Sequence, residues 1–92
     1  MTVSVLMCRP DHFGIEYEIN PWMHVAVAVD HARAEAQWDA LHRTYVDLGV
    51  RIELAAPVAG LPDMVFTANA AVLWDDRAVL SNFQHQERRG EE

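Results

Sequence analysis

The sequence predicts a small α/β domain with a mixed β-sheet and one main helix at about residues 31–48. Three observations support this class: an apolar strand pattern before the helix, an alternating pattern after it, and a hairpin signal toward the C-terminus. Strand–helix–strand order is typical of an α/β unit, and a hairpin adds antiparallel pairing. At 92 residues, the chain is long enough for one small domain over residues 1–92.

The first strand is expected at residues 2–7, a short run of β-branched and apolar residues. Pro10 ends this pattern, because proline cannot donate a ladder hydrogen bond. A long connection at residues 11–30 follows. Within it, residues 25–29 alternate Val and Ala, a pattern that a strand and a loop explain equally well.

The main helix has both of its ends marked in the sequence. Asp30 is a suitable N-cap residue, and Gly49 is suited to the C′ position that follows a helix. Apolar residues recur between them at intervals of three and four, which places them on one helical face. They are Ala34, Trp38, Leu41, Tyr45 and Leu48.

Strand patterns resume after the helix. Residues 50–54 alternate apolar and charged side chains, as in a strand with one covered face. A loop at 57–62 comes next. Residues 64–66 and 70–74 then indicate strand around an irregular centre.

A hairpin and a charged tail complete the predicted order. The adjacent Asp75 and Asp76 are turn residues, so residues 77–80 are expected to return antiparallel to 70–74. Residues 84–92 follow as a polar and charged tail.

Composition narrows the classes of function. The chain has 14 acidic residues against 7 arginines and no lysine, for a net charge of −7, which argues against nucleic acid as a partner. A cationic small substrate is compatible with this charge, although an ordinary acidic surface accounts for it too. The apolar runs are too short to cross a membrane, and the N-terminus lacks a signal-peptide pattern, so we expect a cytoplasmic protein.

The residues around 60–71 carry the clearest candidate chemistry. Asp63 and Asn69 can both face a guanidinium, since a carboxylate accepts two of its N–H donors, and Phe66 can cover the planar cation. The alternative is local structure, with Asp63 capping a turn and Asn69 marking a bulge.

Other candidates are weaker. Arg88 can hold a substrate carboxylate in a bidentate manner, or belong with Arg89 to a solvated basic pair. Asn20, before Pro21, can project its amide into a site or be a plain turn residue. Cys8 fits a small buried apolar residue better than a nucleophile. The five histidines lack metal-ligand spacing and no glycine-rich phosphate loop is present, so neither a metal nor a cofactor is expected.

Several strings together resemble one family. They are MCRP at 7–10, INPWM at 19–23, PDMVFTANA at 62–70 and ERRGE at 87–91. The resemblance is to the dimethylarginine dimethylaminohydrolase, arginine dihydrolase and amidinotransferase-like enzymes of the pentein superfamily, and it covers almost the whole chain. It implies an α/β-propeller of ββαβ units around a central substrate site, of which this chain would supply about one and a half units as a partial domain.

The resemblance also implies roles for single residues. Asp63 matches an aspartate that binds the substrate guanidinium, and Phe66 matches a phenylalanine that lines the same pocket. Arg88 matches the arginine that binds the α-carboxylate, and Asn20 matches a loop asparagine that contacts substrate. Asn69 matches an asparagine of the arginine dihydrolases with a catalytic role, where dimethylarginine hydrolases carry an acidic pair.

The implied reaction is hydrolysis of a C–N bond in arginine or methylated arginine through an amidino group bound to a cysteine. In the family, the catalytic cysteine and histidine lie beyond the part that this chain matches. We therefore expect an N-terminal substrate-binding part that is inactive alone and requires either a missing C-terminal portion or self-association. The alternative is a non-catalytic truncated paralogue that acts as a self-associating binding module.

Overall fold

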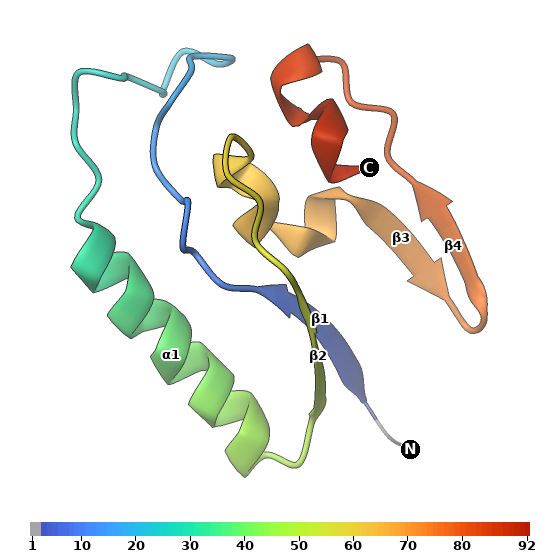
Figure 1. Ribbon diagram of the computed structural model, residues 1–92. Coiled ribbons are helices and arrows are strands. Elements are labelled where there is room, and N and C mark those ends of the chain that lie inside the picture. Colours follow the sequence, from blue (N-terminus) through green and yellow to red (C-terminus); the bar gives the residue numbers. More distant parts are fainter. Residues whose placement is uncertain (1–2) are drawn as a thin grey trace.

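The computed structural model describes residues 3–92 and confirms an α/β fold with one main helix (Figure 1). Thr2, where the first predicted strand begins, lies outside the described residues. The strands are β1 (Ser4–Cys8), β2 (Arg51–Ala55), β3 (Ala71–Trp74) and β4 (Arg77–Leu80), and the helix is α1 (His31–Asp47). Short 3-10 helices lie at Pro62–Val65 (η1), Thr67–Asn69 (η2) and Gln86–Glu91 (η3).

The first sheet is a parallel pair. β1 and β2 align from Ser4 opposite Arg51 to Cys8 opposite Ala55, and α1 is the crossover that parallel strands require. In Figure 1 the helix runs alongside these two strands. Met7 and Cys8 at the end of β1 and Trp38 on α1 are buried, so the small core lies between this strand end and the middle of the helix.

Both ends of α1 form as the sequence predicts. The Asp30 carboxylate accepts a hydrogen bond from the backbone N–H of Arg33 at 3.0 Å, which satisfies a donor of the first turn. At the other end, Gly49 takes a φ of +76°. Its N–H bonds the carbonyl of Val46, and the Val50 N–H bonds that of Tyr45. This pair of bonds is a Schellman motif, which a left-handed glycine makes possible.

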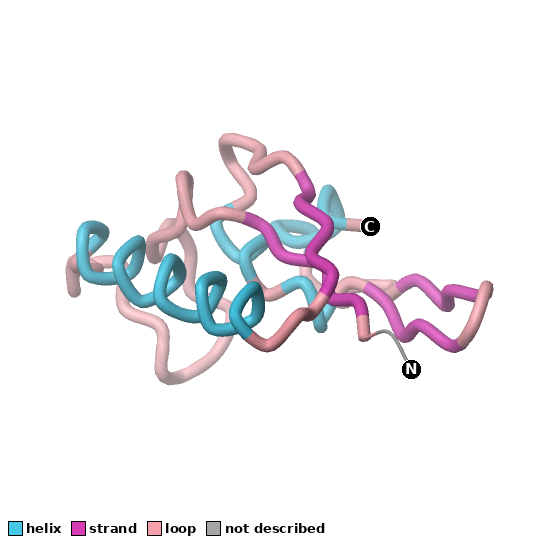
Figure 2. The backbone as a smooth tube through the Cα atoms, turned by 90° about the horizontal axis from the view of Figure 1, so that it is seen from below, coloured by secondary structure: helices cyan, strands magenta, loops and turns pink. Residues whose placement is uncertain are grey.

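The second sheet is the predicted hairpin, separate from the first sheet. Val72 pairs with Val79 across β3 and β4, and the turn places Asp75 at a φ of +55°, a left-handed conformation that Asp tolerates. The side chains are exposed on both faces, and Figure 2 shows the hairpin extending away from the body of the molecule. Parallel and antiparallel pairing thus both occur, in two sheets of two strands.

One strand prediction is wrong, and one open alternative is decided. Residues 64–66 lie in and after η1, where Met64 N–H bonds the carbonyl of Leu61 and Phe66 N–H that of Asp63. Pro62 favours this outcome, because its fixed φ suits the first position of a helical turn. Residues 25–29 form turns and loop, with Val27 N–H bonded to the carbonyl of His24. That segment follows the loop alternative.

The molecule exposes more surface than its size requires. Its accessible area is 6933 Å², whereas a compact monomer of 10.4 kDa exposes about 5,400 Å². The radius of gyration is 14.3 Å, against about 12 Å for a compact chain of this length. The extended hairpin contributes to both differences. Within residues 3–92, no helix has the length and apolar character that a membrane crossing needs.

Candidate substrate-binding site

All five residues that the sequence singled out for substrate or catalysis line one pocket of about 400 Å³. The pocket is formed between the loop that precedes α1 and the three 3-10 helices. This arrangement brings together residues that are far apart in the sequence. Its lining comprises Phe13, Ile15, Ile19, Asn20, Met23, Asp63, Phe66, Asn69 and Arg88.

Asp63 places a buried carboxylate in this pocket, with 8% of the residue exposed. Its position is fixed by η1, which begins at Pro62. One oxygen, Oδ2, accepts a hydrogen bond from the Tyr17 hydroxyl at 2.5 Å. Burial and this bond raise the pKa of Tyr17 above its usual value, so the phenol stays protonated and donates. In the alternative interpretation the Asp63 side chain caps a turn, but η1 has no side-chain cap hydrogen bond.

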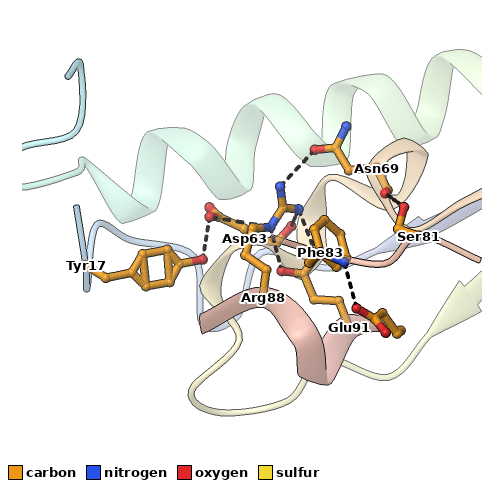
Figure 3. A network of polar contacts seen from close by, with 8 residues as sticks. Tyr17, Asp63, Asn69, Ser81, Phe83, Arg88 and Glu91 are labelled. Atoms are coloured by element: carbon orange, nitrogen blue, oxygen red, sulfur yellow. Dashed lines mark hydrogen bonds and ion pairs between the residues drawn. The ribbon is translucent and has the colours of Figure 1, made fainter. Parts of the chain in front are cut away.

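Arg88 is the centre of the polar network in Figure 3. Its Nε and Nη2 each donate to the Glu91 carboxylate at 2.8 Å. Nη2 also donates to the Asp63 backbone oxygen at 3.3 Å, and Nη1 to Asn69 Oδ1 at 3.2 Å. The guanidinium lies 4.6 Å from the centre of the Phe83 ring, in cation–π contact. The Glu91 bonds raise the pKa of Arg88 further, against the effect of burial.

The polar tail at residues 84–92 folds back onto η1 through η3. Gly90 permits this approach, since a Cβ there would lie 2.9 Å from Leu61 Cδ2. The Arg88 side chain is 14% exposed, so the solvated basic pair does not describe it. Arg89 is exposed, and its Nε donates to the Phe83 carbonyl.

Asn69 and Phe66 complete the inner wall. Asn69 ends η2, and its backbone oxygen accepts a hydrogen bond from the Ser81 hydroxyl while its side chain contacts Arg88. It does not mark a β-bulge. Phe66 is half-exposed and meets Phe13 edge to face, with ring centroids 5.7 Å apart. A flat cation in the pocket would find this ring on one side and the Asp63 carboxylate on another.

Asn20 is both a turn residue and a residue of the pocket, the two alternatives that the sequence left open. Its Oδ1 accepts a hydrogen bond from the backbone N–H of Trp22 at 3.0 Å, which is an Asx turn. Its residue also lines the pocket. The turn uses one lone pair of the side-chain oxygen, and the amide N–H₂ is a donor that can serve a ligand.

Sequence reasoning missed Tyr17 and Glu91. Tyr17 lies in the irregular segment before INPWM and carries no spacing signal. Glu91 stands three residues after Arg88, which is one turn of a 3-10 helix, but it lies within a run of charges that suggested a solvated tail. In the structure its side chain is 1% exposed.

Cys8 is the buried apolar residue that its sequence context favoured. It is 1% exposed, and burial, followed by the charges of Asp11 and Glu91, raises the pKa of its thiol. A buried neutral thiol is a poor nucleophile. The part of the chain that the structure describes holds no group of three side chains suited to a metal ion.

Comparisons with known proteins converge on one kind of enzyme, although no protein-family model matches the chain. An N(G),N(G)-dimethylarginine dimethylaminohydrolase of Mycobacterium tuberculosis is 48% identical over 85 residues, which are 92% of this chain and 28% of that protein. The bifunctional arginine dihydrolase/ornithine cyclodeaminase ArgZ of Synechocystis is 45% identical over 91 residues, 98% of this chain and 13% of ArgZ.

Solved structures agree. The N-terminal domain of ArgZ, bound to product, matches with a TM-score of 0.86 and 42% identity over 99% of this chain and 33% of that domain. AgrE, in a cysteine-to-alanine variant bound to L-arginine, matches with a TM-score of 0.88 and 42% identity over 98% of this chain and 13% of its own. The chain therefore spans less than a third of the length of the curated relatives it matches.

Proposed function

The chain is homologous to the N-terminal part of guanidino-group-modifying enzymes of the pentein superfamily, and we propose that it is the substrate-binding part of a hydrolase of arginine or methylated arginine. The observation that carries the proposal is the buried Asp63 carboxylate beside Phe66 in a pocket of about 400 Å³. The pocket and its immediate support hold two carboxylates, Asp63 and Glu91, and one guanidinium, Arg88. This balance of charge favours a cationic ligand.

In this proposal the substrate guanidinium lies against Phe66 and donates to Asp63. Tyr17 occupies Oδ2 of that carboxylate, so Oδ1 and the second lone pair of Oδ2 are left for the ligand. The Asn20 N–H₂ group donates to the substrate from the loop that precedes α1. Arg88 faces the other end of the substrate, where an Nη1 N–H not used by Asn69 or Glu91 is available for a carboxylate.

Arginine is the preferred substrate because Asn69 is an amide. A carboxylate at this position would pair with a cation more strongly than the neutral amide does. Asn69 also accepts a bond from Arg88, which ties it to the substrate-binding groups. We assign Asn69 a catalytic role, in which its amide assists the hydrolysis.

Turnover requires a nucleophile that this chain does not supply. Cys8 is its one cysteine and is buried with a raised thiol pKa. In the proposed reaction, a cysteine of another segment attacks the guanidinium carbon, an amine leaves with a proton from a general acid, and water then cleaves the amidino-thioether. The binding of L-arginine by an AgrE variant without one cysteine supports this division of roles. The scheme involves no cofactor, no nucleic acid and no membrane, and we place it in the cytoplasm.

Calorimetric titration with L-arginine and its neutral analogue L-citrulline tests this function. The chain is expected to bind arginine at least about tenfold more tightly than citrulline, since a charge-assisted hydrogen bond contributes about 1.5–3 kcal/mol. Asp63→Asn should remove this preference and leave the far-ultraviolet circular dichroism unchanged. Ammonia or amine release from arginine should be undetectable. Equal affinity for the two ligands would contradict the binding role, and turnover by the chain alone would contradict the missing nucleophile.

The exposed hairpin favours a second candidate. A non-catalytic module that self-associates would cover Val72, Trp74 and Val79, which the monomer leaves in water. The open edges of two-stranded sheets also favour pairing with another chain. Both functions share the pocket and differ in what covers the hairpin.

A further inference from the structure

Two carboxylates lie near the Arg88 guanidinium, and only one of them binds it through its side chain. Arg88 Nε lies 3.9 Å from Asp63 Oδ2, beyond hydrogen-bond distance, and both side chains are largely buried. The same Nε and its neighbour Nη2 are each 2.8 Å from Glu91. Arg88 thus gives its bidentate edge to Glu91, although Asp63 is within reach.

The geometry of η3 explains this choice. Residues three apart eclipse one another on a 3-10 helix, so Arg88 and Glu91 share one side of η3. Gly90, on a different side of η3, lets this helix come close to Leu61, and the Glu91 carboxylate is almost completely buried. The ion pair is therefore formed within η3. Where η3 packs against η1, the Nε and Nη2 of Arg88 are already bonded to Glu91.

This pairing bears on the ligand that Asp63 can take. An arginine fork and a substrate guanidinium are the same chemical group and compete for the same carboxylate oxygens. If Arg88 turned its fork to Asp63, the pocket would lose its free negative charge. With Glu91 in place, Asp63 keeps its oxygens for the Tyr17 hydroxyl and for a ligand.

We propose that Glu91 is a positioning residue that keeps Asp63 available to a cationic substrate by holding the Arg88 guanidinium away from it. The inference rests on the proposed function and goes beyond it by assigning charge selectivity to a residue that does not line the pocket. The predicted consequence is specific: loss of Glu91 weakens the binding of a ligand with a guanidinium more than the binding of its uncharged analogue.

Glu91→Gln tests this proposal, because it keeps the shape of the side chain and removes its charge. Glu87→Gln is the matched control, an exposed glutamate on the same 3-10 helix. The ligands are L-arginine, agmatine, which lacks the carboxylate, and L-citrulline, whose ureido group lacks the positive charge of the guanidinium. We expect Glu91→Gln to weaken arginine and agmatine about tenfold or more and citrulline by less than about twofold, since a charged hydrogen-bonding partner is lost. Glu91→Asp, which restores the charge, should recover part of the preference.

A crystal structure of Glu91→Gln supplies a readout that needs no ligand, and it should show Arg88 hydrogen-bonded to the Asp63 carboxylate in place of the 3.9 Å separation. An equal loss for all three ligands would indicate general damage to the pocket and overturn the proposal. Tighter arginine and citrulline with unchanged agmatine would overturn it too, since Glu91 would then only compete with the substrate carboxylate. If the wild type prefers arginine and Glu91→Gln binds all three ligands as the wild type does, this inference is refuted and the proposed function stands. No preference in the wild type refutes the proposed function.

Discussion

The Tyr17 hydroxyl joins the loop before α1 to the pocket floor, since it donates to Asp63 while η1 holds the aspartate in place. A raised pKa for this phenol means that the folded state prefers its neutral form. The stabilisation is fully present below pH of about 10, the ordinary tyrosine pKa, and is lost as the pH rises through the higher folded value. Tyr17 is thus a stabilising contact whose effect has a definite sign with pH.

We predict that Tyr17→Phe removes this alkaline dependence. The variant should lose about 0.5–1.5 kcal/mol of unfolding free energy at neutral pH, the usual value of one hydrogen bond. Between pH 9 and 11 the difference from the wild type should shrink. Urea unfolding across this range measures it, and absorbance at 295 nm follows the ionisation of the two tyrosines. A constant difference between wild type and variant at all pH values would contradict the assigned role.

The site residues differ in how far the sequence could predict them. Asp63, Asn69 and Arg88 lie in strings that resemble a known family, and the structure brings them to one pocket. Tyr17 and Glu91 act through those residues, and their positions depend on how a loop and a terminal 3-10 helix meet η1. Such contacts between distant segments leave no periodic signal in a single sequence.

At the scale of elements, local hydrogen bonding decided what was predictable. The limits of α1 follow from Asp30 and Gly49, because each satisfies backbone groups within a few residues of itself. Residues 64–66 have an apolar composition that suits a strand, but their backbone forms 3-10 hydrogen bonds and does not pair with a strand. Composition alone does not distinguish these outcomes.

The contact between η3 and η1 leads to a prediction at Gly90. In Gly90→Ala, the new methyl group would lie 2.9 Å from Leu61 Cδ2, so Leu61 must change rotamer or η3 must move. We expect a loss of about 0.5–1.5 kcal/mol of stability, the cost of an off-rotamer side chain, and weaker arginine binding because Arg88 shifts with η3.

Gly14→Ala is the control for this change, since its Cβ would meet nothing within 4 Å. Urea unfolding and arginine titration of both variants make the comparison. If the two alanine variants behaved alike, the close approach of η3 to Leu61 would have no energetic role.

For the molecule as a whole, the dominant feature is its large accessible surface. The accessible area of the chain exceeds that of a compact monomer by about 1,500 Å², and a standard protein interface buries about 800 Å² on each partner. The exposed apolar residues of β3 and β4 contribute to this excess area. A further part of the same fold can cover them, as the greater length of the relatives allows, and so can a second copy of the chain.

We predict that the chain alone self-associates at micromolar concentration through this hairpin. Val72 and Val79 are directly paired and share one face, with 71% and 72% of their surfaces exposed. Replacing both with threonine keeps the β-branched shape that strands favour and makes that face polar. Light scattering should show a mass that rises with concentration for the wild type and a monomer for the double variant. Arginine binding should persist in the variant, because neither valine lines the arginine pocket. A wild type that stays monomeric at tens of micromolar would count against self-association and leave a further part of the fold as the partner that β3 and β4 require.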